Sequence, residues 1–133
     1  MKRVMVFGTF DILHPGHIYF LRAAKRHGDF LIVSIARDLN VKRIKGYAPC
    51  YSEHERKKLL QSLKFVDKVV IGAKDDYIGH ILKEKPRVIV LGYDQKEYTR
   101  ELQKKLAKRG LKVNIKRMKP YKPALYKTTT SNL

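Results

Sequence analysis

The sequence has a single cysteine, Cys50, and no segment that is both long and apolar. One cysteine excludes an internal disulfide and any metal site built from several cysteines, and it fits a reducing, intracellular setting. The first apolar run ends at Gly8, too short for the core of a signal peptide, and no later run approaches the roughly 20 apolar residues of a membrane span. We therefore expect a soluble, cytoplasmic protein with no membrane partner.

Acidic residues are scarce as well: 12 Asp and Glu stand against 30 Lys and Arg, which gives a formal net charge of +18. Such an excess suits phosphorylated substrates and it suits nucleic acid, while a lysine-rich solvated surface would need no partner at all. Charge alone does not choose among these. The length of 133 residues suits one core, so we expect a single domain over residues 1–133 with an irregular tail over 116–133.

The common phosphate-binding motifs are also missing. Neither G-x-x-x-x-G-K-[ST] nor G-x-G-x-x-G occurs, which excludes a P-loop and a dinucleotide-binding fingerprint. A different phosphate site is predicted where a short strand, residues 4–7, runs through a turn-rich segment, residues 8–17, into an amphipathic helix. The first N–H groups of a helix have no partner within it, and the helix dipole stabilises an anion at that end. His14 and His17 flank this helix start, so both imidazoles are expected to face one bound phosphate chain.

Strand and helix signals alternate along the rest of the chain. Further strands are predicted at 30–36, 67–71, 88–91 and 111–115, with helices between them that include one ending at a Gly28 cap, one opened by a Ser52 capping box and one over 77–83. Residues 37–51 are predicted to form a long polar loop.

This alternation predicts an α/β fold with a doubly wound parallel five-stranded sheet in the order 3-2-1-4-5. The loops after the first and fourth strands then open onto one crevice, so Asp94 is expected to face the same ligand as the two histidines.

Residues 8–17, Gly-Thr-Phe-Asp-Ile-Leu-His-Pro-Gly-His, match the pattern G-T-F-D-x-x-H-x-G-H without a departure. In this stretch the chain resembles the HxGH nucleotidyltransferase superfamily and, within it, the cytidylyltransferase-like branch. The resemblance implies a Rossmann-like nucleotidyltransferase fold and a reaction in which an acceptor phosphate attacks the α-phosphorus of a nucleoside triphosphate and releases pyrophosphate. It also implies a divalent metal cation, Mg²⁺ or another, that accompanies ATP, and we assign no residue as a metal ligand.

The resemblance places most of the site residues on this motif. His14 and His17 are the expected catalytic residues, because imidazole N–H groups donate to phosphate oxygens and an ordinary pKa of about 6.5 lets phosphates favour the charged form. Lys42 is assigned to catalysis with them, and Lys42 or Lys45 is expected to reach the phosphates from the long loop. The predicted nucleotide-binding residues are Thr9, Phe10, His14, Pro15, Gly16, His17, Asp94 and Tyr121.

Several residues keep a structural alternative. Asp11 either holds the loop or a divalent cation, or bonds its own backbone in a turn, and Asp94 either reads the nucleotide or caps the following helix. Arg56 matches an arginine found in many relatives, but it would need no function as a solvated helix residue. The remaining histidines, His27, His54 and His80, are expected to be structural or exposed.

Two further motifs concern the acceptor. Residues 91–95, L-G-Y-D-Q, resemble the L-G-x-D-Q of archaeal FAD synthases, and residues 36–38 resemble the A-R-D that follows their second strand. The resemblance implies transfer of AMP from ATP to FMN, with FAD and pyrophosphate as products. Small members of this branch commonly form pairs, so a homodimer is expected as well.

Two alternatives remain beside this function. The first alternative, within the same chemistry, is a CTP-dependent glycerol-3-phosphate cytidylyltransferase. Against it, the chain has no tryptophan and lacks the R-x-x-G-[IV]-S-T-T ending of those enzymes. From another class it is a catalytically inactive, basic nucleic-acid-binding protein. The intact HxGH motif and the lack of any recognised nucleic-acid motif argue against that second alternative.

Overall fold

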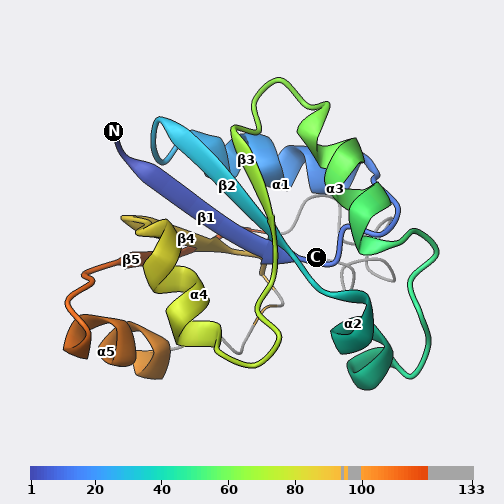
Figure 1. The fold of residues 1–133 in the computed structure, drawn as a ribbon. Helices are drawn as coiled ribbons and strands as arrows, with labels where there is room; N and C mark the ends of the chain where they lie inside the picture. Colours follow the sequence, from blue (N-terminus) through green and yellow to red (C-terminus); the bar gives the residue numbers. More distant parts are fainter. Residues whose placement is uncertain (94, 96–99, 120–133) are drawn as a thin grey trace.

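The computed structural model describes residues 1–93, 95 and 100–119. Within them the chain forms a sheet of five parallel strands in the order β3-β2-β1-β4-β5 (Figure 1). The strands are β1 (Arg3–Gly8), β2 (Phe30–Ile35), β3 (Lys68–Ile71), β4 (Val88–Leu91) and β5 (Asn114–Arg117). The predicted doubly wound sheet and its strand order are confirmed.

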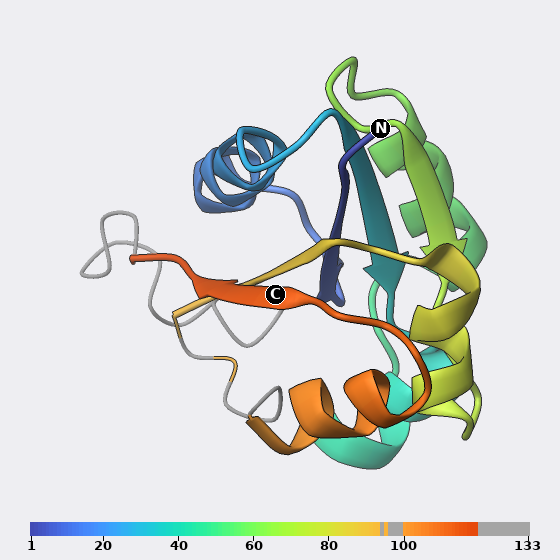
Figure 2. The same ribbon diagram turned by 90° about the vertical axis from the view of Figure 1, so that its left-hand side faces the viewer.

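Two helices pack on each face of the sheet (Figure 2). They are α1 (Pro15–Lys25) and α3 (Glu53–Gln61) on one face, and α4 (Tyr77–Glu84) and α5 (Arg100–Lys108) on the other. Successive strand residues point to opposite faces, so Val4 of β1 joins the core under α1 and α3, whereas Met5 joins the core under α4 and α5. None of the helices in the described part of the chain is long and apolar enough to cross a membrane.

The segment 37–51, predicted to be a long polar loop, instead contains the helix α2 (Asp38–Lys45), which follows the end of β2 (Figure 1). The helix carries ordinary end signals: Asp38 lies in its first turn, basic residues lie in its last turn, and its C-cap, Gly46, has a left-handed φ of 83°. Its buried residue is Val41. A helix that buries so little has no apolar periodicity, which explains why the prediction of a loop was wrong.

Most predicted boundaries agree with the structure to within one residue, and the larger differences concern the fifth strand and the end of helix α1. The fifth strand continues to Arg117, so residues 116 and 117, predicted to belong to an irregular tail, are part of the sheet. The fifth strand begins at Asn114 rather than at residue 111, because the Leu111 N–H donates to Leu106 O and so closes the turn after α5. Helix α1 ends in a right-handed cap at Arg26 rather than at Gly28. Residue 28 must nevertheless be glycine, since a Cβ atom there would lie 2.5 Å from the Lys2 carbonyl oxygen.

A buried carboxylate joins three elements at the amino-terminal end of the sheet. Glu84, the last residue of α4, is 4% exposed, and its Oε1 lies 2.8 Å from Lys68 Nζ of β3 and 3.4 Å from Arg3 Nη2 of β1. Arg3 Nε also donates to the backbone carbonyl of Glu84 at 2.7 Å. These contacts lie at the opposite end of the strands from the loops described below, so they should affect stability rather than function.

We expect Glu84→Gln to lower the free energy of unfolding by about 1 to 3 kcal/mol, because the hydrogen bonds from two cations lose their charged acceptor. Asp75→Asn is the matched control: it removes the same charge from an exposed side chain and should change stability by less than about 0.5 kcal/mol. Urea unfolding of both variants and the parent gives the comparison. Equal stability of all three proteins would show that the Glu84 contacts contribute nothing.

Candidate active site

The strand order changes direction between β1 and β4, which lie side by side with Val4 opposite Val88. The chain winds outward from this pair of strands in opposite directions. The loop after β1, residues 9–14, and the loop that begins at Gly92 after β4 therefore emerge at one edge of the sheet. Ligands of open α/β sheets bind at such a switch point.

Helix α1 begins with the two histidines of the motif. His14 is its N-cap residue, and His14 Nδ1 accepts a hydrogen bond from Gly16 N–H at 3.0 Å. His17 reaches back, and its Nδ1 accepts from His14 N–H at 3.3 Å. The two rings are stacked with their centroids 3.8 Å apart. The arrangement is a capping box in which imidazoles replace the usual hydroxyl and carboxylate side chains.

These hydrogen bonds set the tautomer of both rings. A ring nitrogen that accepts from a backbone N–H carries no proton itself, so the proton of each neutral imidazole lies on Nε2. Nε2 of His17 is buried and makes no hydrogen bond of ordinary geometry within the described part of the chain, although the nearby Ile12 backbone favours a proton on this ring. An unpaired buried donor costs about 1 to 3 kcal/mol, a cost that a ligand oxygen would remove.

Both imidazoles are neutral near pH 7 in the free chain. Burial, followed by the charge of the neighbouring His14, lowers the pKa of His17 to about 3, and burial also lowers the pKa of His14. The expectation that phosphates meet an imidazole close to its ordinary pKa therefore does not hold for the free protein. A bound phosphate would raise both pKa values, because a nearby anion favours the charged form.

The turn before the histidines is tightly held. Phe10 is fully buried and has a left-handed φ of 50°, an uncommon conformation for a bulky residue that tends to occur at functional sites. Its ring makes an edge contact with His17, with centroids 5.4 Å apart. Thr9 is 6% exposed, and Pro15 and Gly16 form the first helical turn. The structure thus brings together the predicted residues of the first loop.

Arg56 anchors this turn from α3. It is 1% exposed, its Nη1 donates to the Thr9 carbonyl at 2.9 Å, and its Nε donates to the Tyr51 carbonyl at 3.0 Å. Its Nη2 forms an ion pair with Asp38 Oδ1 at 2.6 Å. The alternative of a solvated helix residue is therefore wrong. Arg56 ties the first loop to the start of α2 and to the segment before α3.

Asp11 also fixes the segment that precedes α3, through its carboxylate group. Its two carboxylate oxygens accept from the backbone N–H groups of Cys50 and Tyr51 at 2.7 and 2.8 Å. Asp11 therefore bonds a segment 39 and 40 residues away and holds the loop, rather than serving only its own turn. In the described part of the chain, no three His, Cys, Asp or Glu side chains are grouped so as to hold a metal ion.

The two candidate lysines of α2 differ in position. Lys42 is exposed, whereas Lys45 is half-buried and lies close enough to interact electrostatically with Asp11 and His17. Burial lowers the pKa of Lys45, and the charge of Asp11 opposes that shift. The structure therefore brings Lys45 toward the histidines, while Lys42 faces solvent.

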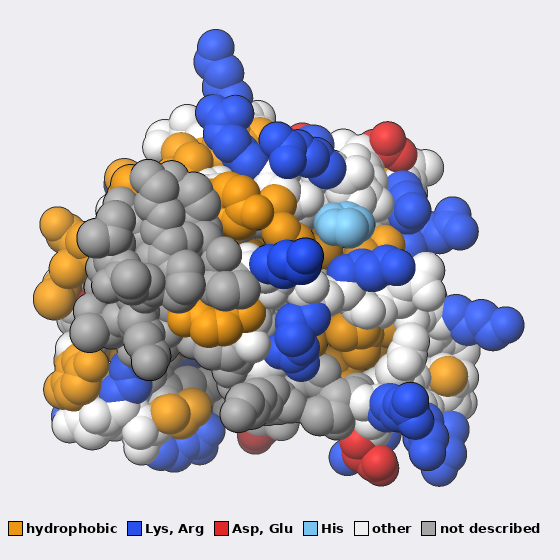
Figure 3. All heavy atoms as spheres, turned by 180° about the vertical axis from the view of Figure 1, so that it is seen from behind, with side chains coloured by type: hydrophobic (Ala, Val, Ile, Leu, Met, Phe, Trp, Pro, Cys, Tyr) orange, Lys and Arg blue, Asp and Glu red, His pale blue; other side chains and the backbone are white. Residues whose placement is uncertain are grey.

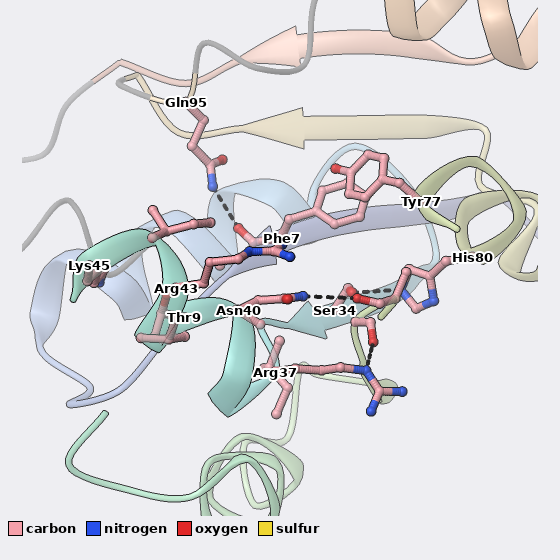
Figure 4. A pocket seen from close by; sticks show the side chains of 17 residues that line it. Phe7, Thr9, Ser34, Arg37, Asn40, Arg43, Lys45, Tyr77, His80 and Gln95 are labelled. Carbon is pink, nitrogen blue, oxygen red and sulfur yellow. Dashed lines mark hydrogen bonds between the residues drawn. The ribbon is translucent and has the colours of Figure 1, made fainter. Parts of the chain in front are cut away.

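A pocket of about 500 Å³ opens beside the first loop, between α2, α4 and the carboxyl ends of the strands (Figure 4). This volume is typical of sites for small molecules. Arg43 and Lys45 lie toward one side of the pocket, and Tyr77 and His80 of α4 lie toward the other, next to Ser34 of β2 (Figure 4). Arg43 and Lys45 thus place positive charge on the side close to the histidine motif. Arg37 adds a guanidinium on the side of Ser34 and His80, where its Nε donates to the Gly72 carbonyl at 2.7 Å (Figure 4).

Gln95 connects the two loops of the switch point. It is 7% exposed, its Oε1 accepts from Gly92 N–H at 2.8 Å, and its Nε2 donates to the Phe7 carbonyl at 2.9 Å (Figure 4). Arg117 of β5 supports the same loop, because its Nη1 donates to the Gly92 carbonyl at 3.1 Å and to the Gln95 carbonyl. Two of the predicted nucleotide-binding residues, Asp94 and Tyr121, lie outside the described residues.

The basic charge of the chain is spread over its surface. On the face opposite to that of Figure 1, Lys and Arg side chains are scattered among apolar ones, with few acidic side chains between them (Figure 3).

Known proteins resemble this chain over most of its length. A family model described as cytidylyltransferase-like matches residues 5–131. An FAD synthase of Aciduliprofundum boonei is 48% identical over 121 residues, which cover 91% of this chain and 80% of that protein. An FAD synthase of Thermoplasma volcanium is 44% identical over 121 residues, which cover 91% of this chain and 84% of that protein.

Comparison of the fold with solved structures identifies the same group of proteins. A crystal structure from Thermoplasma volcanium, described as a lipopolysaccharide core biosynthesis protein, has a TM-score of 0.84 and 44% identity, and the match covers 91% of this chain and 98% of that chain. Its description names a different activity from that of the FAD synthase of the same organism, so the structural match alone would not choose an acceptor. Sequence and fold agree, however, that this chain belongs to the cytidylyltransferase-like family of nucleotidyltransferases.

Proposed function

We propose that the protein transfers the adenylyl group of ATP to FMN, forming FAD and pyrophosphate. One observation carries this assignment: four proteins named FAD synthase are 42–48% identical to this chain over 90% or more of its length. The geometry suits the reaction, because the motif loop offers donors for phosphate oxygens and a pocket for an acceptor opens beside it.

In this reaction an oxygen of the FMN phosphate attacks the α-phosphorus of ATP, and the bond from that phosphorus to pyrophosphate breaks. Two anions must be held in line while negative charge grows on the leaving pyrophosphate. We assign His14 and His17 to these tasks, because their Nε2–H groups face away from the backbone that fixes their Nδ1 atoms. The positive end of the α1 dipole acts on the same oxygens.

The other site residues follow from their positions. We propose that Thr9, Phe10, Pro15 and Gly16 form the surface on which the nucleotide phosphates lie, and Asp94 and Tyr121 stay predictions for the nucleotide. For the acceptor phosphate we propose Lys45 rather than Lys42, because Lys45 lines the pocket on the side of the histidines.

A divalent cation is proposed to enter with ATP. The acid of the motif, Asp11, already has both carboxylate oxygens on backbone N–H groups. This arrangement fits a cation that is held mainly by the triphosphate, as Mg²⁺ commonly is. The homodimer, which rests on resemblance, and the cytoplasmic setting, which rests on the single cysteine and the short apolar runs, also remain proposals. Light scattering tests the former, and a 15.5 kDa particle at micromolar concentration would contradict it.

An acceptor panel tests the function directly. We expect pyrophosphate release from ATP with FMN, and much slower release when CTP replaces ATP or when glycerol 3-phosphate replaces FMN. Chromatography should show FAD as the product. Release only from CTP with glycerol 3-phosphate would identify the cytidylyltransferase instead. If no acceptor supports release while the protein binds nucleic acid with a steep salt dependence, the inactive binding protein is the better description.

We expect His14→Ala and His17→Ala each to lower kcat by about 100-fold or more, because each removes a donor that is aligned with the transition state. Near-normal turnover in both variants would remove the assigned mechanism. Since both imidazoles also cap α1, circular dichroism and melting temperature must accompany the kinetics. A variant that has lost its fold would show only the capping role, so His14→Asn, which retains a capping oxygen, is the second test.

Acid should destabilise the protein partly through His17. The pKa of His17 is about 3 in the folded chain against an ordinary 6.5, so between these values the unfolded chain binds the extra proton. The stability from this group is fully present above pH 6.5 and is lost as the pH falls toward 3.

We therefore expect the free energy of unfolding to fall more steeply below about pH 6.5 in the parent than in His17→Gln, because the variant lacks the imidazole of residue 17. Urea unfolding at a series of pH values gives the two slopes. Parallel curves for the parent and His17→Gln would mean that the folded chain does not hold His17 in its neutral form.

A further inference from the structure

A polar residue interrupts the apolar core at the side of the pocket that Tyr77 and His80 line. Ser34 lies near the end of β2, opposite Phe7 of β1, and is 3% exposed. Ile32, two residues earlier, packs in the core under α4 and α5, and side chains two residues apart in a strand share a face. A buried hydroxyl is costly unless it is hydrogen-bonded, so a serine at this place needs a partner.

That partner is His80 of α4. His80 Nε2 lies 2.8 Å from Ser34 Oγ, and both side chains line the pocket (Figure 4). Burial lowers the pKa of His80, and the charges of Arg37 and Lys83 act in the same direction, whereas Glu84 raises it. The pair is thus neutral near pH 7, although the other side of the same pocket is cationic.

The pair keeps hydrogen-bonding capacity for a ligand. If the Ser34 hydroxyl donates to His80 Nε2, the lone pairs of Oγ remain to accept; if Nε2–H donates to Oγ, the hydroxyl proton is available to donate. The bond between the two side chains is satisfied in either case. A ligand edge with a neutral donor next to neutral acceptors would match both arrangements.

An aromatic side chain lies next to the pair. Tyr77 is three residues before His80 in α4 and lines the same pocket, and its ring centroid lies 5.8 Å from that of Phe7. Residues three apart in a helix share a face, so Tyr77 and His80 point toward the same region. This side of the pocket thus combines an aromatic surface with a neutral polar pair, a combination that fits a flat heterocycle.

We propose that the Ser34–His80 pair recognises the pyrimidine edge of the isoalloxazine ring of FMN, while the FMN phosphate lies at the Lys45 side of the pocket. This inference rests on the proposed function. The pyrimidine edge carries an N–H group between two carbonyl groups, all of them neutral, and the phosphate is the anionic end of the molecule. The anionic end of FMN thus meets the cations of α2, and its neutral edge meets the Ser34–His80 pair, beside which Arg37 donates to the Gly72 carbonyl.

Ser34→Ala and His80→Ala test the inference, with His54→Ala as the matched control. We expect the KM for FMN to rise about tenfold in each pocket variant, while the KM for ATP and the kcat at saturating FMN stay within about twofold of the parent. The double variant should cost little more than either single one, because the two side chains act as one pair. His54→Ala, exposed on α3, should match the parent.

The probe N3-methyl-FMN separates recognition from stability. It lacks the N–H group of the pyrimidine edge, so the parent should bind it about tenfold more weakly than FMN in a fluorescence titration without ATP. Ser34→Ala should bind the two flavins alike. A purely structural pair would lower the melting temperature and leave this ratio unchanged.

Two results overturn the inference. If both pocket variants keep the parent's KM for FMN and its preference for FMN over N3-methyl-FMN, the pair does not contact the ring, although the proposed function stands. If the parent releases no pyrophosphate with ATP and FMN, the proposed function fails first, and the inference fails with it. The assay of the parent therefore distinguishes the two failures.

Discussion

The hydrogen bonds between two imidazoles and the backbone at the start of α1 are the interaction on which the rest of the site depends. Gly16 N–H and His14 N–H donate to the Nδ1 atoms of His14 and His17. The next amides, His17 N–H and Ile18 N–H, donate to the His14 carbonyl. The amides that usually bind an anion at a helix start are therefore already paired. Each ring instead offers its own donor, Nε2–H. This donor lies farther from the backbone than the amides do, and the orientation of the ring sets its direction.

The two Nε2–H donors keep a fixed direction only if the imidazole rings cannot rotate. The packing around the rings prevents that rotation. His17 is fully buried against Phe10, whose left-handed backbone is held in place by the turn. The Thr9 carbonyl is in turn fixed by the buried guanidinium of Arg56. Arg56 and Asp11 also hold the segment at residues 50 and 51, so the first loop, α2 and α3 form one connected structure. Fixed dipoles of this kind need no reorganisation when charge develops.

The sequence predicted the parts of this structure that depend on local pattern. Residues 8–17 identified the loop and its two histidines, and alternating apolar runs predicted the sheet and its order. The pattern did not show α2, because a helix with one buried residue has no apolar face. It also did not show that Arg56 is buried, since its partners at Thr9, Asp38 and Tyr51 are set by tertiary folding. Ser34 and His80 were missed for the same reason: the contact joins residues 46 positions apart.

The charge pattern of the pocket follows from the elements that form its walls. β2 and α4 pack into the core, and the residues that they present, Ser34 and His80, are kept neutral by burial or lack of an ionisable group. The short helix α2 lies outside the core and carries Arg43 and Lys45 in its last turn, where the helix dipole favours cations. This helix thus places positive charge beside the histidines, and the charge of Asp11 partly offsets the desolvation of the half-buried Lys45. The surface cations of a chain with net charge +18 act at longer range and attract any phosphorylated molecule, so selection among such molecules must come from the side chains that line the pocket.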